Sequence, residues 1–131
     1  YATRLSGALA DRFDISVRVE QPSADALAGD PGESSSAVRD RVLAARERQE
    51  ARLGVGRTNS SMSQAELAQH AALGPGAEAV LRAGHEAHEL SGRGWDRVLK
   101  VARTHADLAG RAEVTPEDVD VALHLRRRSE R

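Results

Sequence analysis

Apolar residues recur at three- and four-residue intervals between residues 91 and 109, which is the spacing of one face of an α-helix. Ser91 stands directly ahead of them and suits an N-cap, because its hydroxyl can accept a hydrogen bond from a free N–H of the first turn. The pattern predicts a central amphipathic helix with this face in the core. The apolar positions are Trp95, Val98, Leu99, Ala102, Ala106 and Ala109.

The opposite face of this predicted helix is polar. Residues four apart on it, such as Arg103 and Asp107, can form ion pairs worth a few tenths of a kcal/mol at most. Arg93 is not assigned to such a pair. It lies in the first turn, where the helix dipole and the free N–H groups favour an anion. A phosphate beside Arg93 would balance that charge. The polar positions are Arg93, Asp96, Arg97, Lys100, Arg103, Thr104 and Asp107.

Four more segments are predicted to be helical. Ser63 and Glu66 have the spacing of a capping box, and Thr115-Pro116-Glu117-Asp118 combines an N-cap, a proline at the first helical position and an acidic first turn. Gly84 is expected to mark a close helix crossing. The predicted helices run from a cap at Ser35 or Ser36 to about residue 53, from residue 64 to about 73, from residue 77 to about 89, and from residue 116 onward.

The N-terminal part of the chain has a different pattern. Apolar and polar residues alternate from Phe13 to Val19, which predicts one strand, and residues 1–12 hold a weak helical pattern interrupted by Gly7. A lone strand must pair with a sheet elsewhere or lie loosely on the helices. Residues 21–36 are rich in Pro, Gly and Ser and read as a linker. The predicted fold class is therefore all-α, a small bundle of about five helices preceded by one orphan strand and a flexible linker.

Composition agrees with a small helical bundle. The chain has 131 residues, of which 40% are apolar, but only one Phe, one Trp and one Tyr, so the core must consist mainly of Ala, Val and Leu. The net charge of -1 argues against a generally basic nucleic-acid binder, although it does not exclude a local basic patch. The absence of cysteine excludes disulfides and thiolate metal sites. No signal peptide or membrane span is recognisable, which leaves the cytoplasm as the expected location.

Several enzyme classes have no support in this sequence. Lys100 is the only lysine and no glycine-rich loop precedes it, so the chain has no P-loop. Because the chain also begins at Tyr1, we expect a fragment whose nucleotide-binding half lies upstream. His85 and His88 lack the spacing of a zinc-protease motif and are expected at the surface, and no metal site is predicted.

Arg12 precedes the predicted strand and permits two interpretations. An extended backbone could project it toward a phosphate, or it could form a salt bridge with Asp11 or Asp14. The arginine-rich helix at residues 36–53 likewise has two interpretations, a solvated face or a basic surface for DNA or a partner subunit.

Separated motifs, taken together, resemble one family. The chain is similar to the C-terminal part of the magnesium-chelatase-like AAA+ ATPases of the YifB/ComM group, and the resemblance covers nearly the whole chain. The motifs occur in the same order, at Leu5 to Ile15, Gly32 to Ser35, Ala45 to Gln49, Thr58-Asn59, and Leu90 to Arg93 continuing to Asp107-Leu108.

The resemblance implies a domain division. Residues 1–22 would be the end of the AAA+ core, with the arginine-finger segment and the last strand. Residues 23–34 would be a linker, and residues 35–131 the helical lid domain. Residues 1 to about 34 are expected to be poorly ordered in this chain because their sheet would lie upstream.

The resemblance also implies two site residues. In such ATPases the arginine before this strand acts in trans as a finger on the ATP of the neighbouring subunit, and Arg12 matches that position. The arginine of the lid helix is sensor 2, which contacts the γ-phosphate in cis or from a neighbour, and Arg93 matches it. Both roles suit guanidinium, a permanent planar cation that binds phosphate bidentately. ATP and Mg²⁺ are the expected cofactors of the full-length protein, with none bound to this fragment.

The implied function is a lid that couples ATP binding and hydrolysis to conformational change in a ring, in a DNA-directed motor such as a helicase or branch-migration enzyme. Expected partners are the upstream AAA+ core, neighbouring subunits of a homo-oligomeric ring, and DNA, with no membrane. The fragment alone is expected to be monomeric and inactive. Two alternatives stay open: a magnesium-chelatase motor subunit for porphyrin metallation, and a free-standing helical module that binds protein or DNA.

Overall fold

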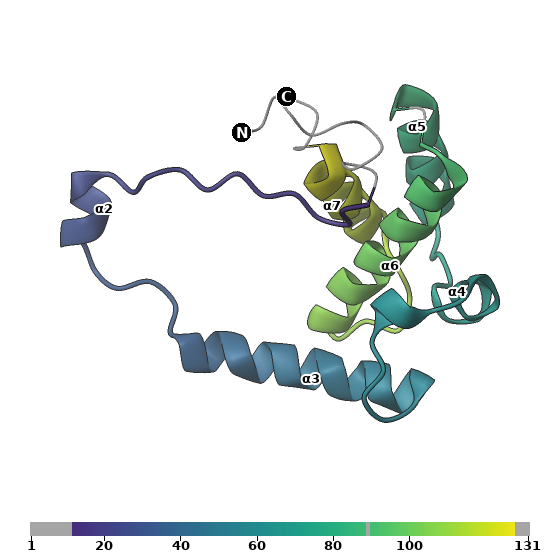
Figure 1. Ribbon diagram of the computed structural model, residues 1–131, viewed down its shortest axis with the longest axis horizontal. Helices are drawn as coiled ribbons and strands as arrows, with labels where there is room; N and C mark the ends of the chain where they lie inside the picture. The colour runs from purple at the N-terminus through teal and green to yellow at the C-terminus, as the bar shows by residue number, and fades with distance from the viewer. Residues whose placement is uncertain (1–11, 89, 128–131) are drawn as a thin grey trace.

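The computed structural model describes residues 12–88 and 90–127, without the side chains of His88 and Arg127. This part of the chain is helical and contains no sheet, which confirms the all-α prediction. Figure 1 shows α5, α6 and α7 packed together, with α3 lying below them. In chain order the elements are α2 (Ala24–Ala28), α3 (Ser35–Leu53), the 3-10 helix η2 (Asn59–Ser61), α4 (Gln64–His70), α5 (Ala77–His88), α6 (Gly92–Leu108) and α7 (Pro116–Arg127).

Helix α6 is the centre of the fold, as its pattern predicts. It packs against α7, α3, α4 and η2, while α5 packs against α7. Trp95 and Leu99 lie partly buried at the edge of the core, and Ala109 is the exposed C-cap of α6. Small aliphatic residues therefore build the core, in agreement with the composition. The core residues are Ala77, Leu81, Leu90, Val98, Ala102, Ala106, Val114, Val119, Ala122 and Leu123.

Side-chain caps define the helix starts. Ser34, rather than Ser35 or Ser36, caps α3 by accepting a hydrogen bond from the N–H of Ala37 at 3.2 Å. The predicted capping box at the start of α4 is confirmed, because the Ser63 and Glu66 side chains accept from each other's backbone N–H groups. At α6, the Ser91 hydroxyl accepts from the N–H of Gly94 at 3.1 Å. These local contacts explain where the three helices begin.

The predicted strand at residues 13–19 is not formed. Within the described residues this segment makes one backbone hydrogen bond to the bundle, from the N–H of Ser16 to the carbonyl of Leu125 at 3.1 Å. Its apolar side chains stay largely exposed, from 50% at Ile15 to 89% at Val19. A strand needs a neighbour for its row of backbone groups, and no described segment pairs with this one.

The predicted linker is not entirely irregular. Ala24–Ala28 forms the short helix α2, whose N-cap Ser23 accepts a hydrogen bond from the N–H of Ala26. This helix has no buried residue. Figure 1 shows α2 standing away from the other helices. The weak helix predicted over residues 1–12 lies outside the described residues apart from Arg12, which is in a turn.

Gly84 lies at a close crossing of α5 and α7, as predicted. A Cβ at this position would lie 2.5 Å from Cδ1 of the buried Leu123. We expect Gly84→Ala to lower the free energy of unfolding by about 1–3 kcal/mol through overpacking, despite the better helix propensity of alanine. Gly92→Ala is the matched control, because a Cβ there would meet nothing within 4 Å. Urea unfolding of both variants would check this, and equal effects would contradict it.

None of the helices in the described part of the chain combines the length and the apolar character that crossing a lipid bilayer requires.

Candidate functional site

Arg93 lies in the first turn of α6, at the N-terminal end of the central helix. Its side chain is exposed. Among the described residues, the ion pairs of α6 use Arg97, Arg103, His105 and Asp107 and do not include Arg93. An exposed guanidinium beside free helix N–H groups forms a positive site that suits a phosphate.

Arg12 is exposed in a turn at the start of the described chain. The carboxylate of Asp14, one of its two predicted salt-bridge partners, instead binds the Arg97 guanidinium at 2.9 Å. The other predicted partner, Asp11, lies outside the described residues. Arg97 is on α6, one helical turn after Arg93, so this ion pair holds the segment after Arg12 against the central helix.

The C-terminal part of α7 brings these two segments together. The Arg126 Nη1 lies 3.5 Å from the carbonyl oxygen of Phe13, which directly follows Arg12. The Nη2 of the same guanidinium lies 3.3 Å from the position that a Cβ of Gly94 would occupy. Gly94 directly follows Arg93, so one side chain lies against the residues that follow both predicted site residues.

We call Arg12, Arg93, Arg97 and Arg126 the arginine end of the bundle. The sequence singled out Arg12 and Arg93 but gave no reason for them to be neighbours. Arg97 and Arg126 were missed as members, because nothing local to either residue shows that residues 13–16 lie over them. Arg12 and Arg93 are its exposed members, Arg97 is paired with Asp14, and exposed guanidinium groups suit an anionic ligand.

A buried ionic network anchors the other end of α6, and it corrects the prediction of an exposed polar face. Asp107 and Arg103 are completely buried. The Asp107 carboxylate binds Arg52 of α3 at 2.6 Å and Arg103 at 3.1 Å, and it accepts a hydrogen bond from the Asn59 amide at 2.8 Å. Helix α3 and η2 cover this face, so charges predicted to face water are inside.

Arg103 also closes the C-terminal end of α6. Its guanidinium donates to the backbone carbonyls of Arg111 and Ala112, both at 2.5 Å. Burial lowers the pKa of Arg103, and the nearby Asp107 carboxylate opposes that shift. The network therefore fixes both the position of α6 and the loop that leads to α7.

Asp118 forms a second buried cluster near this end. Its carboxylate contacts the guanidinium of Arg111 and the Nδ1 of His105, the latter at 2.6 Å, and accepts hydrogen bonds from the backbone and side chain of Thr115. Burial raises the pKa of Asp118, but the hydrogen bonds from Thr115, His105 and Arg111 outweigh it and lower the pKa to about 2. His105, predicted as a partly buried packing residue, is partly buried and also orients this carboxylate.

We expect this carboxylate to make the fold sensitive to acid. Because the pKa of Asp118 falls from 3.8 to about 2 on folding, its stabilisation is complete above pH 3.8 and is lost as the pH approaches 2. Urea unfolding between neutral pH and pH 2 should therefore show a steeper acid loss in the native sequence than in Asp118→Asn. Asp120→Asn, at an exposed position, should keep the native slope. Parallel curves for all three proteins would contradict this assignment.

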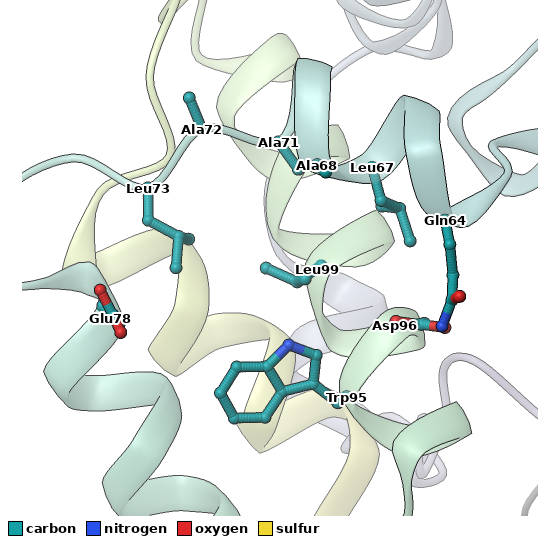
Figure 2. Close-up of a pocket in the computed structure, with 10 residues that line it drawn as sticks. All are labelled: Gln64, Leu67, Ala68, Ala71, Ala72, Leu73, Glu78, Trp95, Asp96 and Leu99. Atoms are coloured by element: carbon teal, nitrogen blue, oxygen red, sulfur yellow. The ribbon is translucent and has the colours of Figure 1, made fainter.

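An open pocket of about 630 Å³ lies between α4, the start of α5 and the N-terminal half of α6. Figure 2 shows the Trp95 indole and Leu99 in the middle, Gln64 and Asp96 at one end and Glu78 at the other. No local pattern predicted this pocket, because its walls come from three separate segments. The remaining apolar lining is Leu67, Ala68, Ala71, Ala72 and Leu73.

The histidines predicted at the surface offer little metal-binding chemistry. His85 is exposed, and its ring meets the Trp95 ring edge to face with centroids 5.7 Å apart. The side chain of His88 lies outside the described residues. Across residues 12–88 and 90–127, there is no cluster of three or more metal-ligating side chains.

The fold and site thus define a small helical domain with a cationic end. Residues 32–126 match the family described as magnesium chelatase, subunit ChlI C-terminal. The chain belongs to this family.

Full-length relatives agree with the family match. The chain is 39% identical to YifB of Escherichia coli over 129 residues and 36% identical to the competence protein ComM of Haemophilus influenzae over 128 residues. A protein of Mycobacterium tuberculosis is 40% identical over 128 residues. Each alignment covers 96% of this chain but 25% of the relative. The chain therefore spans about a quarter of the length of these relatives.

Proposed function

We propose that this chain is the helical lid of a ring-forming AAA+ ATPase, in which it couples ATP binding and hydrolysis to movement between subunits. The observation that carries the proposal is the arginine end, where Arg126 contacts the residue after Arg12 and approaches the residue after Arg93. Exposed guanidinium groups suit nucleotide phosphates, with Arg12 acting on the ATP of a neighbouring subunit and Arg93 acting in cis or from a neighbour. Membership of the magnesium chelatase family supports the same function.

In this proposal Arg12 is the finger that reaches the ATP of a neighbouring subunit, and Arg93 is sensor 2. Arginine fingers raise the rate of phosphoryl transfer by about 10³–10⁵-fold, because they stabilise charge on the transferring phosphoryl group. The segment before this chain would hold ATP with its Mg²⁺. The chain itself would contribute the guanidinium groups of Arg12 and Arg93. The isolated chain should therefore neither bind ATP tightly nor hydrolyse it. A cytoplasmic location is part of the same proposal.

We favour DNA as the substrate of the motor. The alignments with YifB and ComM cover nearly the whole chain, and the name of ComM refers to competence. The second candidate is a motor subunit that drives magnesium insertion into a porphyrin, which the family description favours.

The test uses the full-length protein. Its ATPase rate should rise when single- or double-stranded DNA is added, and should not change with a porphyrin and the other chelatase subunits. The reverse pattern would select the chelatase motor. Absence of any nucleotide binding by the full-length protein would overturn both and leave a helical binding module.

A further inference from the structure

Helix α3 carries an apolar stripe of which only half is covered. Ala45 and Gln49 are buried, and Val38 and Val42 continue the same face at helical spacing toward the N-terminus. Val38 and Val42 are 40% and 42% exposed. Figure 1 shows this N-terminal half of α3 extending beyond α6 and α7. The helix therefore presents an apolar strip that the described residues leave uncovered.

Basic side chains flank this strip. Arg39 and Arg46 lie three residues before and four residues after Val42, which places them beside it on the helix surface. Among the described residues, neither forms an ion pair, whereas Arg41 is held by Glu33. We call Val38, Arg39, Val42 and Arg46 the α3 strip.

The pocket of Figure 2 has the complementary character. Its middle is apolar, with Trp95 and Leu99, and its ends carry the carboxylates of Asp96 and Glu78, while no arginine or lysine lines it. Glu78 forms an ion pair with Arg82, whereas Asp96 forms no ion pair with a described residue. An apolar side chain next to a cation fits such a pocket, because the aliphatic part packs on the indole while the charge reaches a carboxylate.

A chain cannot place its own α3 strip in its own pocket. The C-terminal part of α3 is fixed to α6 through Arg52 and Asp107, and a continuous helix cannot fold back on itself. In Figure 1 the free half of α3 points away from α4 and the start of α5, which form two walls of the pocket. The strip and the pocket therefore lie on different sides of the molecule.

We propose that the α3 strip of one copy docks in the Trp95 pocket of a second copy. Because two different surfaces meet, the contact is head to tail and repeats from copy to copy, which closes into a ring when the rotation permits. This inference adds a contact to the ring of the proposed function, but it does not depend on nucleotide. It departs from the monomer that the sequence predicts for the isolated chain.

The first test measures self-association of the 131-residue chain from micromolar to millimolar concentration. Trp95 is the only tryptophan, so its emission reports the pocket directly, and sedimentation velocity reports mass. We expect a blue shift of the emission that follows the formation of oligomers. A chain that stays monomeric throughout, or associates without any change in emission, overturns the proposal.

Val42→Asp should weaken this association at least about tenfold, because it places a carboxylate in the apolar contact. The matched control is Val55→Asp, since Val55 is 93% exposed in a loop away from the strip. Val42 is itself partly exposed, so the variant should remain folded, which circular dichroism would verify. Equal association of the two variants would exclude the α3 strip as the contact.

Mixing two variants tests the head-to-tail geometry. Asp96→Lys damages the pocket and Val42→Asp damages the strip, so each variant alone should be monomeric. Their mixture retains one intact strip and one intact pocket, and should form a one-to-one complex. A mixture that stays monomeric overturns the pairing of these surfaces. ATP hydrolysis is not needed for either readout, so failure here leaves the proposed function standing.

Discussion

Asp107→Ala is expected to lower the free energy of unfolding by about 3–5 kcal/mol, the largest stability effect among the substitutions considered. Asp107 is completely buried between Arg103 and Arg52, and Arg103 is buried with it. Removing the carboxylate leaves two guanidinium groups without their counter-charge and the Asn59 amide without one acceptor. The variant should also loosen α3, because Arg52 holds that helix to α6.

Urea unfolding followed by circular dichroism measures this effect. Glu78→Ala is the matched control, since it removes one carboxylate from the exposed ion pair with Arg82 and should cost about 0.5 kcal/mol or less. A loss for Asp107→Ala within the error of that control would mean that the network does not hold α6 in place.

Arg12→Ala and Arg93→Ala are expected to reduce ATP turnover of the full-length protein at least about tenfold each, while the protein stays folded. Both side chains are exposed, so their loss removes no packing. If Arg12 contacts the nucleotide mainly during hydrolysis, kcat should fall with little change in KM. Arg93→Lys should restore only part of the activity, because an ammonium group cannot bind phosphate bidentately.

Arg18→Ala is the control for Arg12, because Arg18 is an exposed arginine on the same segment. It should leave turnover near the native value. Steady-state ATPase assays with sedimentation of the ring would separate a chemical defect from an assembly defect. Native turnover in both Arg12→Ala and Arg93→Ala would exclude these residues from the nucleotide site.

Local signals in the sequence predicted most of the helices. The capping box at Ser63, the N-cap at Ser91 and the helix start at Thr115 depend on side chains that bond to a backbone N–H three residues away. Such contacts need no tertiary partner, so sequence spacing is sufficient to predict them. The start of α3 was misplaced by one or two residues, because three consecutive serines offer the same cap.

The errors lie where distant segments decide the outcome. An exposed and a buried ion pair have the same four-residue spacing, so Arg103 and Asp107 could not be recognised as buried. Their burial depends on Arg52 and Asn59, which are 55 and 48 residues from Asp107 in the sequence. Alternation at residues 13–19 likewise indicated a strand, but a strand also requires a neighbouring strand with which to pair.

The sequence by itself determined the helical class, the central position of α6 and the family, and it singled out Arg12 and Arg93. These follow from periodicity, capping and motifs, which are properties of nearby residues. The tertiary structure alone decided that residues 13–16 lie against α6 and α7, that the polar face of α6 is partly buried, and that α3 leaves half of its apolar stripe exposed. The physical reason is that burial and proximity depend on which segments meet, and the spacing within one segment carries no information about its partner.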